Sequence, residues 1–172
     1  HEEILKKESN SLFSYNDTQS QKLICSIDNA LDIEGYTNSL NSKIKGRIIW
    51  SSSPDRGLQL ILDNWVKWKE KRSDLSLVIC SPPYSKDWFQ TDITQLKDVQ
   101  WLGNLSPKEL REQQSKAEYW IYASDYLETY CITALEMMLQ KVKIITNGAG
   151  NIKNLIGDGE RGIMIDEIDP DL

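Results

Sequence analysis

Short apolar runs alternate with amphipathic stretches from residue 47 onward in this 172-residue chain. Apolar runs of four to six residues predict buried strands, and apolar positions spaced three or four residues apart predict helices between them. The predicted strands are 47–50, 75–80, 99–102, 119–122, 142–145 and 162–165, and the predicted helices are 58–66, one that starts at 107, 134–139 and 152–156. This alternation predicts an α/β fold with a Rossmann-like parallel sheet, flanked by helices and joined by right-handed crossovers.

The first 46 residues follow a different pattern. Residues 1–20 are polar and have room for one short helix, and 23–27 predict a short strand. The stretch 32–46 is rich in Asn, Ser and Gly and has little periodicity, so it is predicted to be a linker or loop. The chain is therefore expected to divide near residue 46.

Composition excludes several classes of function. With 40% hydrophobic and 27% charged residues the chain has the make-up of a soluble globular protein, and it has no apolar run of the roughly 18 residues that a membrane helix needs. A net charge of −6 argues against binding of nucleic acid. Three scattered cysteines predict neither a metal cage nor a disulfide framework, which favours the cytoplasm or the cytosolic face of a membrane. The only histidine is His1, so a Ser-His-Asp triad or a zinc site with His ligands is not expected.

Parallel sheets bind ligands at the carboxyl ends of their strands, which directs attention to the loops 51–57, 81–84, 103–106, 123–130 and 147–151. In the first of these loops, serines and Gly57 meet the start of a helix, where backbone N–H groups attract anions. Arg56 adds a cation that can grip phosphate with two hydrogen bonds. The alternative is that Ser53 or Asp55 caps the helix and Arg56 is solvated, and both interpretations are open at this point. No G-x-G-x-x-G or P-loop pattern occurs.

Two carboxylates, Glu128 and Glu136, lie eight positions apart across a predicted loop-to-helix junction. We expect both to border one cleft, where they would accept hydrogen bonds from the hydroxyl pairs of a sugar or ribose. The alternative is two surface glutamates on an amphipathic helix. Because Glu136 lies within an apolar stretch, its carboxylate needs a polar partner, which favours a functional role. The turn 147–151 is rich in Gly, so its backbone can closely approach a ligand.

Taken together, these loops resemble the C-terminal, donor-binding half of a retaining, nucleotide-sugar-dependent glycosyltransferase of the GT-B fold, family 4-like. The pair Glu128 and Glu136 resembles that family's signature of two glutamates separated by seven residues. Further motifs in the same order are similar to the family's: N-A-L-D at 29–32, S-S-P-D-R-G-L at 52–58, W-L-G-N-L-S at 101–106 and G-D-G-E-R-G at 157–162. The resemblance implies one half of a GT-B architecture.

The resemblance also implies roles for individual residues. Arg56 would neutralise the diphosphate of the leaving group, and Glu128 would lie near the donor sugar, so these two are the expected catalytic residues. Glu136 would bind the ribose hydroxyls. The remaining residues implied to bind substrate are Ser52, Ser53, Gly57, Ser81, Gly103, Asn104, Leu105, Tyr130, Cys131 and Ile132. The family needs neither metal nor cofactor for this chemistry, and the substrate would be a donor such as a UDP- or GDP-hexose.

By the same resemblance, residues 1–46 would be the tail of an N-terminal domain with the interdomain connection, and 47–172 would be the nucleotide-sugar-binding domain, truncated before its closing helix. A glycan, lipid-linked or protein acceptor would bind the missing N-terminal domain, so we expect this fragment alone to be inactive. The chain departs from the family at Ser51, Ala149 and Asn154, where an arginine, a glycine and a glutamate are usual. The alternatives are a degenerate nucleotide-binding or scaffold domain, or half of a sugar-nucleotide epimerase or phosphorylase. The absence of an internal histidine argues against the epimerase.

Overall fold

The computed structural model describes residues 29–37, 41–81, 91–157 and 159–166. Within these ranges the strands form one parallel six-stranded sheet in the order β3-β2-β1-β4-β5-β6. The strands are β1 (Arg47–Trp50), β2 (Ser76–Ile79), β3 (Val99–Trp101), β4 (Tyr119–Tyr122), β5 (Lys143–Thr146) and β6 (Ile163–Met164). The predicted fold class is therefore confirmed. The predicted helix within 1–20 and the predicted strand 23–27 lie outside the described residues.

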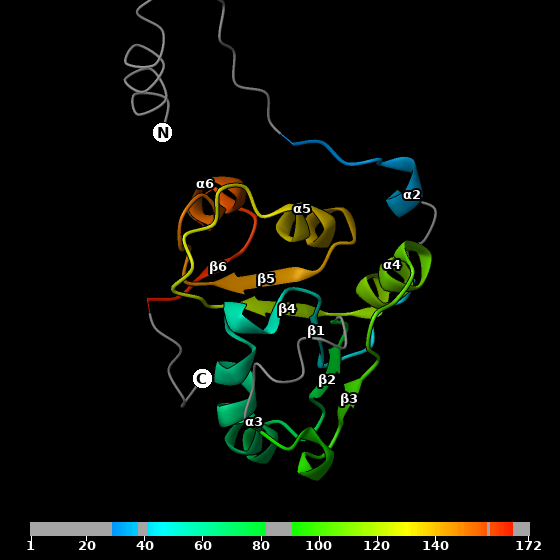
Figure 1. Ribbon diagram of the computed structural model, residues 1–172, viewed down its shortest axis with the longest axis vertical. Coiled ribbons are helices and arrows are strands. Elements are labelled where there is room, and N and C mark those ends of the chain that lie inside the picture. The colour runs from blue at the N-terminus through cyan, green and yellow to red at the C-terminus, as the bar shows by residue number, and fades with distance from the viewer. Residues whose placement is uncertain (1–28, 38–40, 82–90, 158, 167–172) are drawn as a thin grey trace, which may run out of the picture.

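Helices cover both faces of this sheet. They are α2 (Glu34–Thr37), α3 (Leu58–Lys71), α4 (Pro107–Lys116), α5 (Ile132–Leu139) and α6 (Ile152–Ile156), with 3₁₀ turns η1 (Pro54–Arg56) and η3 (Ile93–Gln95). Helix α3 lies on one side of the sheet, and α5 and α6 lie on the other (Figure 1). The chain reverses its direction across the sheet between β1 and β4, and right-handed crossovers then require the change of face. The crevice at such a switch point is where doubly wound folds bind ligands.

Local sequence chemistry accounts for the start of α4. The Ser106 hydroxyl accepts a hydrogen bond from the backbone N–H of Glu109 at 3.4 Å, and the Glu109 carboxylate accepts one from the backbone N–H of Ser106 at 2.9 Å. Pro107 occupies the first helical position, where its missing N–H costs nothing. This reciprocal capping box confirms the helix start predicted from sequence.

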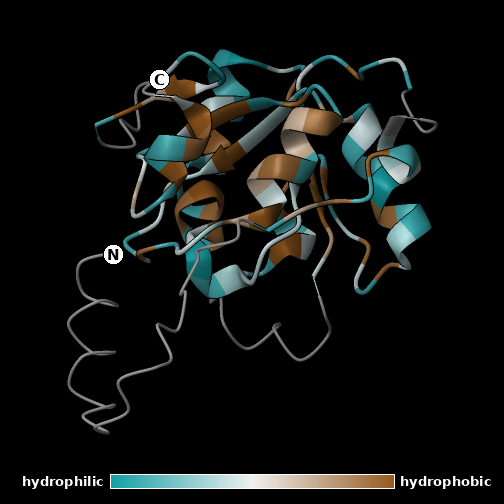
Figure 2. Cartoon of the chain, turned by 90° about the horizontal axis from the view of Figure 1, so that it is seen from above, coloured by the Kyte–Doolittle hydropathy of each residue, from teal (hydrophilic) through white to brown (hydrophobic). Residues whose placement is uncertain are grey.

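The core consists of the strands and the apolar faces of the helices, as the colouring of Figure 2 shows. Three fully buried rings lie side by side in its centre: Tyr122 stacks on Trp120 with ring centroids 4.8 Å apart, and on Trp50 at 6.0 Å. Trp65 and Trp68 of α3 are also buried and belong to this core. The packed aromatic layer fixes the end of β4, and with it the loop that follows.

The prediction that 32–46 is only a linker or loop was wrong in one respect. Residues Glu34–Thr37 form the one-turn helix α2, and the side chain of Tyr36 is buried against the domain. A single turn is too short to show a helical period, and a distant contact stabilises it, so the sequence pattern gave no signal for it.

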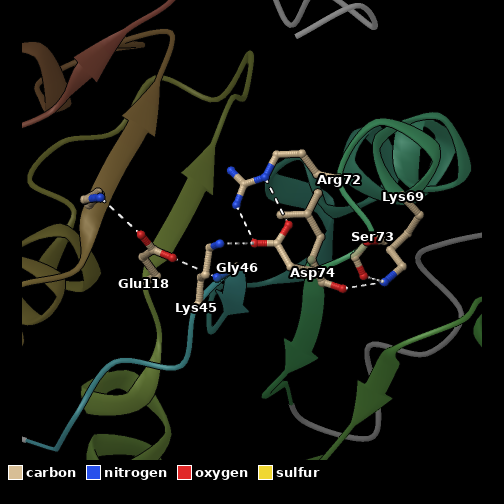
Figure 3. Close-up of polar contacts among 9 residues, drawn as sticks. Lys45, Gly46, Lys69, Arg72, Ser73, Asp74 and Glu118 are labelled. Carbon is tan, nitrogen blue, oxygen red and sulfur yellow. Dashed lines mark hydrogen bonds and ion pairs between the residues drawn. The ribbon is translucent and has the colours of Figure 1, made fainter.

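Polar side chains hold the amino ends of the strands together (Figure 3). The Glu118 carboxylate accepts hydrogen bonds from the backbone N–H of Gly46 at 2.7 Å and from Lys143 at 3.1 Å. The Gly46 N–H, more than any other group, lowers the pKa of Glu118. The neighbouring Arg72 pairs with Asp74 at 2.9 Å. These contacts join the starts of β1, β4 and β5 at the end of the sheet opposite the loops predicted to bind ligand.

Candidate functional site

A cavity of about 420 Å³ lies at the switch point, between the loop after β1 and the loop that leads into α5. It brings together seven of the residues predicted to bind substrate, although Arg56 and Glu128 are 72 positions apart in the sequence. Its lining consists of Asn29, Ser51, Ser52, Ser53, Arg56, Glu128, Thr129, Tyr130, Cys131, Ile132 and Thr133.

The two predicted catalytic residues are in direct contact. A guanidinium nitrogen of Arg56 lies 2.8 Å from Oε1 of Glu128, and the hydroxyl of Tyr122 donates to the same oxygen. The ring of Tyr126 faces the guanidinium carbon at 3.2 Å from the ring centroid. The alternative of a solvated Arg56 beside a side-chain cap is not what the structure shows, because neither η1 nor α3 begins with a capping side chain.

The charge states of this cluster follow from its burial. Burial and the Glu128 carboxylate both raise the pKa of Tyr122 above its usual value. Burial alone would lower the pKa of Arg56, but its contacts with Tyr122 and Glu128 outweigh that effect and raise it. At neutral pH Arg56 is therefore a permanent cation in the cavity, and the Tyr122 hydroxyl behind it remains a hydrogen-bond donor to Glu128.

Unsatisfied donors line the same cavity. Within the part of the chain that the structure describes, the buried Oγ of Ser51 and Nε of Arg56 make no hydrogen bond, and the nearest carboxylate to this Nε is that of Asp55 at 3.7 Å. Native structures rarely leave buried donors without a hydrogen bond. On the opposite wall, the first-turn N–H groups of α5, at Ile132 and Thr133, have no partner within the helix. The positive end of the helix dipole lies at the same place. Donors therefore reach the cavity from two sides, an arrangement that fits an anion with several oxygens.

The loop before α5 is held in an unusual conformation. Cys131 has a left-handed backbone with φ of 55°, which is rare for a residue other than glycine. Glu128 forms a parallel bridge with Gly150, and its carbonyl accepts a hydrogen bond from the N–H of Asn151 at 2.8 Å. A Cβ on Gly150 would lie 2.5 Å from the backbone N and O of Glu128. The Gly-rich turn 147–151 thus packs against the backbone of Glu128 and holds this residue in place.

Glu136 has the polar partners that its apolar surroundings require. It lies one turn beyond Thr133 on α5 and accepts hydrogen bonds from the Tyr36 hydroxyl at 2.7 Å and from the Gln114 amide at 2.9 Å. It is not part of the cavity lining, so the expectation that both carboxylates border one cleft is correct for Glu128 alone. Thr133, which lines the cavity, and Glu136 are three positions apart on α5, so helical geometry places them on the same face of the helix.

The other predicted residues lie around the cavity without lining it. Ser81 is buried and donates its hydroxyl to the carbonyl of Ser52 at 3.1 Å, so it supports the loop 51–56. Gly57 has φ of 114° and borders a neighbouring cavity of about 750 Å³. A Cβ there would lie 2.1 Å from the carbonyl oxygen of Ala123, which explains the glycine. Gly103, Asn104 and Leu105 follow β3, two strand positions from β1, and are outside the cavity lining.

Sequence reasoning missed several contributors. Asn29, Ser51, Thr129 and Thr133 line the cavity, and Tyr122 contacts Glu128 from below. Tyr122 could have been selected from sequence, because it is the last residue of a buried strand and therefore lies at the carboxyl end of the sheet. The sequence contains no signal for Tyr36 and Gln114 as partners of Glu136, since the folded structure alone brings α2 and α4 next to α5. Among the described residues there is no cluster of three or more His, Cys, Asp or Glu side chains that could hold a metal.

Comparison with known proteins assigns the family. The family described as "Glycosyl transferases group 1" matches residues 49–172. The chain belongs to this family. Over 125 residues it is 26% identical to the lipopolysaccharide 1,2-N-acetylglucosaminetransferase of Salmonella typhimurium, a match that spans 67% of this chain and 33% of that protein. The chain thus spans about a third of the length of this curated relative.

Solved structures of the group share the fold. The C-terminal domain of the group 1 glycosyl transferase LpcC from Francisella tularensis superposes with a TM-score of 0.59 at 18% identity, over 83% of this chain and 78% of that one. The Anabaena protein HepE, solved in complex with UDP-glucose, gives a TM-score of 0.64 at 15% identity, over 83% of this chain and 43% of that one. The predicted half of a GT-B glycosyltransferase is thereby confirmed at the level of fold and family. In the described part of the chain, every helix is too short or too polar to cross a membrane.

Proposed function

We propose that this domain binds a nucleotide-diphosphate sugar and serves a retaining glycosyltransferase as its donor site. The observation that carries the proposal is the paired Arg56 and Glu128 in a cavity that also contains the unpaired Ser51 hydroxyl, at the switch point of the sheet. This combination supplies donors for a diphosphate and a carboxylate for a sugar within one space. The family membership supports a transferase, and the structure of HepE with UDP-glucose makes a uridine donor a natural first test alongside GDP.

The diphosphate would bind between the loop 51–56 and the start of α5. Arg56 would share its guanidinium between Glu128 and the phosphate oxygens, since its Nε lies 3.7 Å from the Asp55 carboxylate and makes no hydrogen bond within the described residues. The Ser51 hydroxyl and the α5 N–H groups would complete the hydrogen bonds, in place of the second cation that is usual in the family. As the bond to the sugar breaks, these donors stabilise the negative charge that develops on the leaving diphosphate. No metal or cofactor is needed for this step.

The hexose would lie against Glu128. Its carboxylate is fixed through Oε1 by Arg56 and Tyr122, so it can orient sugar hydroxyls and stabilise positive charge at the anomeric carbon. Attack by the acceptor on the face that the diphosphate leaves would retain the configuration without a protein nucleophile. The ribose would bind Glu136, and the base would border 103–105 and the Ser81 turn. The acceptor, a glycan, lipid-linked molecule or protein, would bind a further domain, with the reaction in the cytoplasm or at the cytosolic face of a membrane.

Titration calorimetry with UDP, GDP and their hexose conjugates tests the donor site. We expect one nucleotide to bind saturably and its affinity to fall at least tenfold in both Arg56→Ala and Glu136→Ala. Arg72→Ala is the matched control, because Arg72 makes its contacts at the opposite end of the sheet and should leave affinity unchanged. If no nucleotide binds at millimolar concentration, either to this chain or to the full-length protein, the domain is a degenerate one and the proposal fails.

A further inference from the structure

Both carboxylate oxygens of Glu136 are held by the protein. Tyr36, 100 residues upstream, donates its hydroxyl to Oε1 at 2.7 Å. Gln114 of α4 donates its side-chain amide to Oε2 at 2.9 Å. Two elements that are distant in sequence thus converge on one side chain of α5, which fixes both its position and the plane of its carboxylate.

The Tyr36 hydroxyl remains protonated, and so remains a donor to Glu136, at neutral pH. Only 6% of the Tyr36 residue is exposed, and burial together with Glu136 raises the pKa of its hydroxyl to about 12. The hydroxyl is therefore a donor under all ordinary conditions. The guanidinium of Arg111 lies 5.5 Å from the centroid of the Tyr36 ring and faces it, so α4 also holds this side chain from the ring side.

Gln114 contributes at a cost. It is completely buried, and its side-chain amide oxygen has no hydrogen-bond partner among the residues that the structure describes. A buried unpaired acceptor is unfavourable, and an apolar side chain of similar length would avoid that penalty at this position of α4. The presence of glutamine at position 114 is therefore better explained by the hydrogen bond from its amide to Glu136 than by packing.

Counting acceptor positions shows what this arrangement leaves available. An ionised carboxylate has two oxygens with about four lone-pair positions in all. Tyr36 and Gln114 occupy one position on each oxygen, so among the described residues one position on each remains. Two adjacent acceptors of fixed orientation match the two neighbouring hydroxyl groups of a ribose. Thr133, one turn back along α5, already lines the cavity, so the carboxylate is within reach of a nucleotide bound there.

We propose that Tyr36 and Gln114 are positioning residues that fix Glu136 as a two-point acceptor for the ribose diol, and so determine the preference for ribonucleotides over 2′-deoxyribonucleotides. The inference rests on the proposed donor site. It adds α2, a segment outside the main domain predicted from sequence, to the specificity of that site.

The test compares the affinity of the full chain for UDP and 2′-deoxy-UDP, or for the corresponding guanosine pair if GDP is the nucleotide that binds. In Tyr36→Phe the ring still packs but the hydroxyl is lost. We expect the preference for the ribonucleotide to fall roughly three- to tenfold, the value of one hydrogen bond, while binding of the deoxynucleotide changes little. Tyr119→Phe, at the start of β4 and away from the cavity, is the matched control and should retain the full preference.

Gln114→Met gives a second, independent reading, because methionine keeps the length and packing but cannot donate. It should lower the preference by a similar factor. If both variants remain folded and retain the wild-type preference, or raise it, the inference is overturned while the donor site stands. If the wild-type chain binds no nucleotide, or binds the ribo- and deoxy-forms equally, the proposed role of Glu136 fails and the inference fails with it.

Discussion

At the scale of single residues, the environment of Glu128 depends on a neighbouring hydroxyl. Tyr122 donates to Oε1 of Glu128, the oxygen that also pairs with Arg56, and its ring is locked between Trp50 and Trp120. Tyr122→Phe keeps the stacking and removes one hydrogen bond to a charged group. We expect the free energy of unfolding to fall by about 1–2 kcal/mol in chemical denaturation. Tyr126→Phe, which changes an exposed tyrosine beside the same arginine, should alter it by less than about 0.5 kcal/mol. Equal effects of the two substitutions would contradict this assignment.

A second prediction at this scale concerns pH. Because the folded pKa of Tyr36 is raised to about 12, above the unfolded value of 10.0, the folded state disfavours ionisation. The corresponding stability is fully present below pH 10 and is lost as the pH rises toward 12. Between pH 9 and pH 11 we expect the free energy of unfolding of the wild type to fall by about 1 kcal/mol more than that of Tyr36→Phe. Urea unfolding at both pH values measures this difference. Between pH 6 and pH 8 the gap between the two proteins should be constant, and a gap independent of pH up to 11 would rule out the shift.

At the scale of elements, the Gly-rich turn before α6 positions the loop that carries Glu128. Gly150 has φ of 67°, and any Cβ there would overlap the backbone of Glu128. Gly150→Ala should therefore cost about 2–4 kcal/mol of unfolding free energy and weaken nucleotide binding, since the loop must move. Gly159→Ala is the matched control. Its φ is 103°, but the nearest atom to a Cβ is the carbonyl oxygen of Gly162 at 3.7 Å, so only the backbone cost of about 1 kcal/mol applies. Similar losses in the two variants would show that the contact with Glu128 is unimportant.

The same scale shows what sequence could and could not predict. Strand β1 follows from a local apolar run and was predicted with its observed bounds, and the start of α4 follows from the Ser106-Pro107 pattern and was predicted at its observed residue. The short α6 was predicted with its observed bounds. Helix α2 was missed because its stability comes from Tyr36 touching α5, a contact that no local pattern encodes.

In the candidate site too, features that depend on local sequence could be predicted, whereas features that depend on contacts between distant segments could not. The loops that follow β1 and β4 could be selected from the rule for parallel sheets, and Arg56 and Glu128 were chosen from chemistry and resemblance. The contact between Arg56 and Glu128 could not be predicted, because it depends on strand order and on side-chain orientation. The unpaired hydroxyl of Ser51 was likewise invisible. In the sequence it is only the place where a usual arginine is absent, whereas in the structure it is a donor that lines the cavity.

At the scale of the whole molecule, the two walls of the cavity belong to the two halves of the sheet. The loop 51–56 follows β1 and belongs with β2 and β3, whereas 128–133 follows β4 and belongs with β5 and β6. The halves are joined by the β1–β4 pairing, by Gly57 packing on Ala123, and by the Arg56–Glu128 ion pair. A ligand that contacts both walls adds a further link between them, so its binding should stabilise the domain as a unit.

Thermal unfolding with and without nucleotide measures that effect. A ligand at a hundred times its Kd, bound only to the folded state, adds about 2.7 kcal/mol, which for a chain of this size corresponds to a rise in Tm of roughly 5–11 °C. The transition should stay single, because both halves gain from one ligand. Arg56→Ala should abolish most of the shift at the same ligand concentration, whereas Arg72→Ala should retain it. A shift that survives Arg56→Ala, or a transition that splits in two on binding, would place the nucleotide on one half of the sheet alone.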